Sequence, residues 1–162
     1  MWTVIDSPIG ELRLVEHAGA ITAIEFSPLR EVAAANGQPR GVRSDDHPVL
    51  LECARQLAAY FARDLKEFDL PLAPGGSAFQ QLVWDALCGI GYGETASYGE
   101  VAHRIGRTNA ASRAVGLANG SNPIPIVIPC HRVIGANGTL TGYAGGLERK
   151  QLLLGLEQDA LF

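Results

Sequence analysis

The fold is decided by residues 97–120, which have the sequence SYGEVAHRIGRTNAASRAVGLANG. Ser97, with Glu100 three residues later, is typical of a capping box that starts a helix. This helix is expected to end in a short RTN turn, and AASRAVGLANG predicts a second helix of small side chains that carries Ser112 and Arg113. Two short helices joined by a tight turn predict a helix-turn-helix, although such helix pairs are more frequent in enzymes than in DNA-binding proteins.

Upstream, the first 30 residues contain three short apolar runs, WTVI, ELRLVEH and AITAIEF, which predict a small antiparallel β-meander. Residues 32–47 predict a weak helical turn followed by a loop. Pro48 opens the amphipathic stretch VLLECARQLAAYFARDL, which predicts a helix with proline in its first turn. Residues 70–77, LPLAPGGS, predict a linker between two subdomains, because proline and glycine extend neither a helix nor a strand.

Downstream, Ser77 is expected to cap a helix over AFQQLVWDALCGI. Residues 126–133, IVIPCHRV, are apolar and β-branched and predict a buried extended segment. The Ala136-Asn137-Gly138 sequence is typical of a hairpin turn and predicts a small wing behind the helix pair. Four leucines predict a terminal helix over residues 148–157 that packs on the core.

The composition predicts a globular chain with its own core. The 162 residues are 47% hydrophobic and 19% charged, which fits one domain or two small ones. No apolar run reaches the roughly 18 residues of a membrane span, and the first residues lack a signal-peptide pattern, so we expect a soluble, cytoplasmic protein without membrane contact. The net charge is −4, but residues 97–162 hold six bases and four acids, so a polyanion is expected to prefer this half.

The cysteine and histidine residues predict no metal site. The three cysteines, Cys53, Cys88 and Cys130, are widely spaced and form no C-x-x-C pair. Cys53 and Cys88 lie in apolar helical segments, where a free cysteine usually behaves as a small hydrophobic residue. The four histidines show no paired ligand spacing, so we predict neither a metal nor a cofactor.

Cys130 is the cysteine whose neighbours indicate chemistry. Pro129 fixes its position, and the positive charges of His131 and Arg132 beside it would lower the pKa of the thiol and activate a thiolate nucleophile. Glu157, among the leucines of the terminal helix, is the acid expected to orient His131. The alternative is an inert buried cysteine next to a surface histidine and a surface glutamate, because adjacent side chains on an extended chain point to opposite faces.

The motif around Cys130, PCHRV at residues 129–133, has further motifs on both sides of it in the chain. These are SPIG at 7–10, SYGEVA at 97–102, RAVG at 113–116, NPIPI at 122–126 and GYAGGL at 142–147. Together the motifs closely resemble the O6-alkylguanine-DNA alkyltransferases, which repair DNA by direct reversal. The resemblance covers essentially the whole chain. It supports both the hypothesis that the protein binds DNA and the hypothesis that Cys130 is a nucleophile.

The resemblance implies an α+β protein with two parts. Residues 1–70 would form an N-terminal α/β subdomain, ribonuclease H-like in the family, and residues 77–162 a C-terminal winged helix-turn-helix domain, with a linker at 71–76. The resemblance also implies the reaction, in which the Cys130 thiolate takes the alkyl group from O6 of a flipped-out guanine. Because the thioether product is not readily reversed, each molecule would act once and need no cofactor. O4 of thymine is left open as a second target.

For DNA, the resemblance implies that the helix pair enters the minor groove of a duplex carrying O6-alkylguanine. Arg113 would insert where the damaged guanine leaves the stack, and Tyr98 would promote rotation of the nucleotide and bond the flipped base. The alternative for Arg113 is a phosphate contact or a solvated charge. Ser112 and the backbone at Ala111 would lie near phosphate. We expect a monomer, nucleoid-associated in a bacterium, and leave cooperative binding to DNA open.

For the reaction site, the resemblance implies that His131 acts as a base through water, that Glu157 orients it and that Asn122 is a hinge between the second helix and the active-site segment. The guanine pocket would contain Pro125, Val133, Tyr143 and Lys150. Ala144 stands where many relatives have serine. The resemblance implies that the contact there uses the backbone N–H, so we expect alanine to preserve it.

Two other classes of protein stay open on the residues alone. A cysteine hydrolase would use the same Cys130, His131 and Glu157, but it needs an oxyanion hole and forms a labile acyl intermediate. A winged helix-turn-helix regulator needs no nucleophile and usually reads two half-sites as a dimer. The small side chains of AASRAVGLANG disfavour such base readout.

Overall fold

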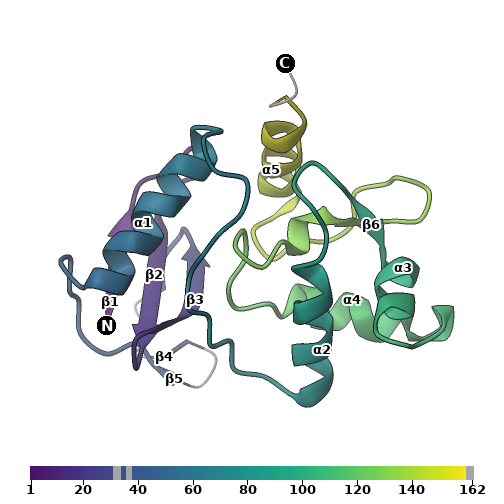
Figure 1. Ribbon diagram of the computed structural model, residues 1–162, viewed down its shortest axis with the longest axis horizontal. Helices are drawn as coiled ribbons and strands as arrows, with labels where there is room; N and C mark the ends of the chain where they lie inside the picture. Colours follow the sequence, from purple (N-terminus) through teal and green to yellow (C-terminus); the bar gives the residue numbers. More distant parts are fainter. Residues whose placement is uncertain (31–33, 36–37, 160–162) are drawn as a thin grey trace. The chain divides into compact units, whose positions relative to one another are not determined.

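A computed structural model describes residues 1–30, 34–35 and 38–159 and divides into two compact units, Met1–Gly75 and Gly76–Phe162 (Figure 1). The expected boundaries at 1–70, 71–76 and 77–162 stay a prediction. Part of the expected linker is bound to the first unit, because the N–H of Ile21 donates to Pro71 and the N–H of Ala73 donates back to Ile21.

The first unit is built on the predicted β-meander, which is confirmed. Strands β1 (Trp2–Ile5), β2 (Leu12–His17) and β3 (Ala20–Phe26) form an antiparallel sheet in that order. Helix α1 (Pro48–Phe61) packs against all three strands, as Figure 1 shows, and its N-terminus is capped by the His47 side chain. The core between the helix and the sheet contains buried apolar side chains, which are Leu12, Leu14, Ile21, Ile24, Leu50, Leu57 and Tyr60.

Residues 34–35 and 38–39 differ from the predicted helical turn. Strand β4 (Ala34–Ala35) pairs with strand β5 (Gln38–Pro39) in antiparallel register. This pairing satisfies backbone groups that a helical turn would have bonded internally. Residues 31–33 and 36–37 lie outside the described residues.

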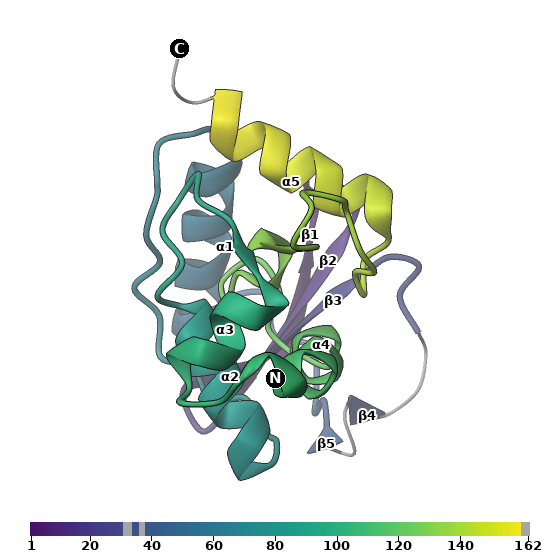
Figure 2. The same ribbon diagram turned by 90° about the vertical axis from the view of Figure 1, so that its right-hand side faces the viewer.

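The second unit contains the predicted helix-turn-helix, which is confirmed. Helix α2 (Ala78–Leu87) precedes α3 (Tyr98–Arg104) and α4 (Ser112–Gly120), and a 3₁₀ turn over Asn109–Ala111 leads into α4 (Figure 2). Ser97 and Glu100 form the expected capping box at α3, and Ser77 forms a second one with Gln80 at α2. The α+β fold predicted for the chain is therefore confirmed.

The predicted wing hairpin around Ala136-Asn137-Gly138 is wrong in its pairing. Strand β7 (Val133–Ile134) pairs in parallel with β6 (Ala96–Ser97), immediately before α3, and no strand follows the turn among the described residues of this unit. The turn itself is present, because the N–H of Gly135 donates to Thr139 and Gly138 adopts a φ of 82°. The parallel pairing with β6 links the helix pair to the segment that follows Cys130.

The terminal helix α5 (Leu147–Asp159) agrees with the prediction and carries buried polar residues as well as Leu153. It contacts the 3₁₀ turn over Cys130–Arg132. In the described part of the chain, helices are too short or too polar to cross a bilayer.

Candidate active site

Cys130 ends a segment, residues 122–130, that is buried throughout. Asn122 braces this segment, because its Nδ2 donates to the Ile128 carbonyl at 2.8 Å and its Oδ1 accepts from the Ile124 N–H at 3.0 Å. The backbone turns at Ile126, whose φ of 74° lies in the left-handed region that β-branched residues rarely adopt. Such a conformation costs on the order of 1–3 kcal/mol and persists where surrounding contacts hold it. The cysteine is therefore placed by a tightly constrained loop.

His131 and Glu157 are brought together from the 3₁₀ turn and from α5. The His131 Nε2 lies 2.7 Å from the Glu157 Oε2, and the side chains are 0% and 1% exposed. The N–H of Gly93 donates to Glu157 Oε1 at 3.2 Å. The expected contact between these residues is present, while their chemical roles stay predictions.

Arg132 belongs to the same network, although the sequence analysis treated it only as a nearby charge. Its Nε and Nη2 donate to the two oxygens of Glu157 at 2.9 Å and 3.0 Å, and its Nη1 donates to the Ile90 carbonyl at 2.6 Å. This two-point contact fixes the plane of the carboxylate as well as its position. The signal that could have found it is its place in PCHRV, directly after the candidate base.

The Cys130 thiol is 3% exposed, and burial raises its pKa to about 11. Side-chain hydrogen bonds with Asn122 and Tyr143 and the positive charge of Lys150 act in the opposite direction. Lys150 is itself fully buried, and its Nζ donates to the carbonyls of Val133 at 2.6 Å and Thr141 at 3.2 Å. The expectation that neighbouring charges lower the thiol pKa below its ordinary value is therefore wrong for this structure, because desolvation outweighs them.

Burial also lowers the pKa of His131, so its imidazole is neutral at pH 7. Glu157 opposes this shift, whereas the charges of Arg132 and Lys150 add to it. With Glu157 accepting from Nε2–H, the neutral ring leaves a lone pair on Nδ1. Nδ1 is buried and has no hydrogen-bond partner among the described residues. The ring is thus prepared to accept a proton at Nδ1.

The candidate DNA-contacting residues lie on α3 and at the start of α4. Arg113 is exposed, and Ser112 and Ala111 are half-buried. The hydroxyl of the half-buried Tyr98 and the hydroxyl of Thr141 are hydrogen-bonded to each other. A Cβ added at Gly116 would lie 3.7 Å from the Tyr98 ring, so α4 passes close to it. Arg113 and Tyr98 therefore come from the two helices of the motif.

The expected pocket residues differ in exposure. Pro125 and Val133 are buried, Tyr143 is half-buried, and Ala144 is exposed. Tyr143 and Lys150 both act on the Cys130 thiol, as described above. The structure thus gathers Tyr143 and Lys150 with Cys130, His131 and Asn122, whereas Ala144 lies at the surface.

The other cysteines and the metal-binding residue types form no second centre in the described residues. Burial raises the pKa of Cys53 to about 12, and no histidine adjoins this cysteine in the sequence. Within residues 1–30, 34–35 and 38–159, no group of three histidine, cysteine, aspartate or glutamate side chains could hold a metal ion.

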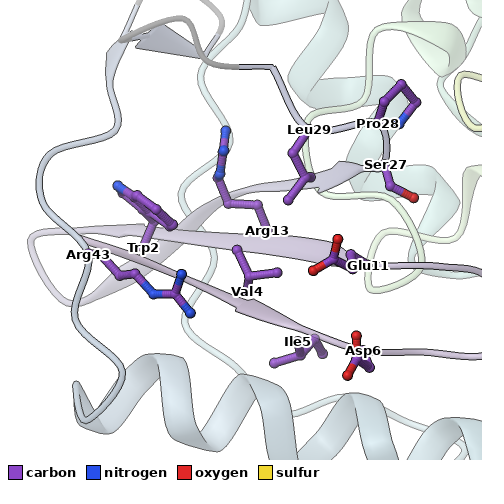
Figure 3. Close-up of a pocket in the computed structure, with 10 residues that line it drawn as sticks. All are labelled: Trp2, Val4, Ile5, Asp6, Glu11, Arg13, Ser27, Pro28, Leu29 and Arg43. Carbon is purple, nitrogen blue, oxygen red and sulfur yellow. The ribbon is translucent and has the colours of Figure 1, made fainter.

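A hollow of about 700 Å³ belongs to the first unit, whereas Cys130 belongs to the second. Figure 3 shows Trp2 at one side of it with Arg13 and Arg43, whose guanidinium carbons lie 4.9 Å and 5.4 Å from the ring centroid. Asp6 and Glu11 line it as well, so its charge favours neither an anion nor a cation.

Comparison with known proteins gives the same result for both units. Residues 1–74 match the ribonuclease-like domain of 6-O-methylguanine DNA methyltransferase, and residues 78–159 match its DNA binding domain. A methylated-DNA–protein-cysteine methyltransferase of Mycobacterium bovis is 51% identical over 98% of this chain and 92% of that protein. The corresponding protein of Methanosarcina acetivorans is 48% identical over 96% of this chain and 97% of its own length. The crystal structure of Mycobacterium tuberculosis OGT in complex with DNA superimposes with a TM-score of 0.85 at 48% identity and covers 98% of this chain and 93% of that one.

Proposed function

This chain belongs to the 6-O-methylguanine DNA methyltransferase family, and we propose that Cys130 is the residue that accepts the alkyl group when it repairs DNA by direct reversal. The observation that carries the assignment is the buried His131, which follows Cys130 in the chain, is held by Glu157 through Nε2 and keeps its Nδ1 lone pair. Neither Cys53 nor Cys88 has a histidine beside it in the sequence.

The proposed reaction is an in-line displacement at the alkyl carbon. The thiol proton passes to Nδ1 of His131 through a bridging water, the Cys130 Sγ forms a bond to the alkyl carbon, and the bond from that carbon to guanine O6 breaks. The electron pair of the broken bond stays on guanine, and the proton on His131 returns to the guanine, so the leaving base is neutral. The charge of Lys150 favours the thiolate during this step.

The high resting pKa of the thiol has a consequence for the proton transfer. With a pKa of about 11, Cys130 holds little thiolate at neutral pH, so proton transfer to His131 has to accompany binding of the substrate base. Because a thioether is not readily reversed, each molecule acts once.

The helix pair is the proposed DNA-binding surface, and the minor groove is its proposed site on the duplex. Arg113 stands exposed at the start of α4, where it can fill the space that a flipped guanine leaves. Tyr98 lies on the other helix and would crowd the rotating nucleotide, while Ser112 and Ala111 would face phosphate. Residues 97–162 hold six basic and four acidic residues, a net positive charge that favours a polyanion. We propose that a monomer acts in the cytoplasm.

The proposed guanine pocket is formed by Tyr143 and Lys150 beside the thiol, with Pro125 and Val133 as its apolar wall. Ala144 contributes only its backbone N–H. Glu157 positions His131, and Asn122 holds the loop that carries Cys130.

Intact-mass measurement after incubation with a duplex oligonucleotide containing one O6-methylguanine tests the assignment of Cys130. We expect a gain of one methylene per molecule, mapped to Cys130, with no further gain on long incubation. Cys130→Ala should abolish transfer and retain DNA binding, while Cys88→Ala, which removes an exposed thiol, should react like the wild type. A methyl group on another residue, or more product than protein, would overturn the proposal.

The role of Arg113 is tested by comparing two substrates. Arg113→Ala should slow repair in duplex DNA much more than reaction with free O6-alkylguanine, because only the duplex requires base flipping. Arg55→Ala, an exposed charge in the first unit, is the control and should change neither rate. Equal losses on both substrates with Arg113→Ala would contradict an inserting role.

A further inference from the structure

Asn119 is a buried amide on α4 that directly contacts the backbone of Cys130. It is 3% exposed, and its Nδ2 donates to the Cys130 carbonyl at 3.3 Å. The same carbonyl accepts the N–H of Val133, which closes the 3₁₀ turn. Asn119 therefore joins the helix that carries Arg113 to the turn that carries the thiol.

The other atom of this amide makes Asn119 unusual. Its Oδ1 is buried and has no hydrogen-bond partner among the described residues. Asn122, three residues later, uses both ends of its amide within the loop. A buried polar atom without a partner lowers stability, and an apolar side chain of similar size would avoid this cost. A polar residue that persists under such a cost points to a role outside stability.

The geometry of α4 shows what that role can be. Arg113 is exposed and Asn119 is buried, so the helix presents one to solvent and the other to the cysteine. The C-terminal end of the same helix is fixed by the Trp84 indole, which donates to the Ala118 carbonyl at 2.9 Å. A fixed helix with one amide on the Cys130 carbonyl sets the position of the nucleophile relative to the DNA-binding face.

We propose that Asn119 is a positioning residue, which holds the Cys130 backbone in register with α4 so that a base delivered by this helix meets the sulfur in line. This inference rests on the proposed function of Cys130. The hydrogen bond from Asn119 to the Cys130 carbonyl is then part of the reaction geometry. The unpaired Oδ1 is the cost in stability of keeping an amide at this position.

Two buried amides make a matched test, Asn119→Leu and Gln56→Leu. Gln56 in the first unit is also 3% exposed, but both ends of its amide are bonded, with Nε2 on the Asp69 carbonyl and Oε1 accepting from the Asp69 N–H. Asn119→Leu should keep or raise the melting temperature and slow single-turnover methyl transfer on duplex DNA at least tenfold, with DNA affinity unchanged. The reaction with free O6-alkylguanine, which no helix delivers, should slow much less. Gln56→Leu should lower the melting temperature by several degrees and leave the transfer rate constant unchanged.

A second variant, Asn119→Asp, provides a signature that a structural role would not produce. A protonated carboxyl can donate to the Cys130 carbonyl, whereas an ionised one repels it, so the transfer rate should fall with rising pH in a range where the wild-type rate does not. A wild-type rate constant for Asn119→Leu on duplex DNA, a loss confined to DNA affinity, an equal loss on free O6-alkylguanine, an equal loss with Gln56→Leu, or a wild-type pH profile for Asn119→Asp would each overturn the inference. If the wild-type protein gains no methyl group on Cys130, the proposed function itself fails.

Discussion

Replacing Arg132 by methionine should destabilise the second unit strongly, because it leaves the buried Glu157 without its cation. The guanidinium makes two hydrogen bonds to Glu157 and one to Ile90, and the two side chains are 8% and 1% exposed. Methionine fills much of the same volume but offers no donor. Removing one partner of such a buried pair typically costs about 3–5 kcal/mol of unfolding free energy.

The loss should depend on pH in a defined direction. In the wild type, burial and the Arg132 charge keep the pKa of His131 below its ordinary value, so stability falls as the pH drops below 6.5. In the variant, His131 can take up a proton as counter-ion to Glu157, and its raised pKa adds stability at acidic pH that is lost as the pH rises. The difference between the two proteins should therefore be largest near pH 8 and smallest near pH 5. Each unit by which the His131 pKa differs contributes about 1.4 kcal/mol to this change.

Urea denaturation in a Trp2→Phe background measures this difference, because Trp84 then remains as the single tryptophan and lies buried in α2. Arg43→Met, which removes an exposed ion pair with Asp45, is the control and should shift the transition little at any pH. A loss below about 1 kcal/mol, set against the 3–5 kcal/mol expected for a buried pair, or a loss that is equal at pH 5 and pH 8, would refute the reasoning.

Three further changes test other parts of the structure. Ser97→Ala removes one half of the α3 capping box and should lower the unfolding free energy by about 0.5–2 kcal/mol, measured by urea denaturation, and an unchanged midpoint would contradict the role of the cap. Burial raises the pKa of Cys130 from 9 to about 11. The stability that the protonated thiol contributes is therefore complete below pH 9 and is lost between pH 9 and pH 11, a loss of about 3 kcal/mol. In Cys130→Ala, the denaturation midpoint should fall less steeply between pH 9 and pH 11 than in the wild type. An equal pH dependence of the midpoint in the two proteins would contradict the raised pKa of Cys130. Lys150→Met removes the positive charge that favours the thiolate and should slow methyl transfer and shift its pH dependence to higher pH, so an unshifted profile in single-turnover assays would exclude this role.

The sequence determined those features that depend on residues close together in the chain. The capping boxes at Ser77 and Ser97 join residues three positions apart, and the alternating runs of the first 30 residues specify a meander with short turns. The motif around Cys130, together with the further motifs on both sides of it, was sufficient to identify the family, because each is a contiguous stretch of the chain. Local hydrogen bonds and side-chain periodicity specify such features, and both can be read from the sequence.

Only the tertiary structure decided which distant groups share the buried space around Cys130. The pair of Arg132 with Glu157 spans 25 residues, and the parallel pairing of β6 with β7 replaced the hairpin that the local turn predicted. The direction of the Cys130 pKa shift also came from burial, which no neighbour in the sequence reports. The physical reason is that a buried polar group is stable only with a partner, and the packing of whole elements, rather than spacing along the chain, determines which partner lies within reach.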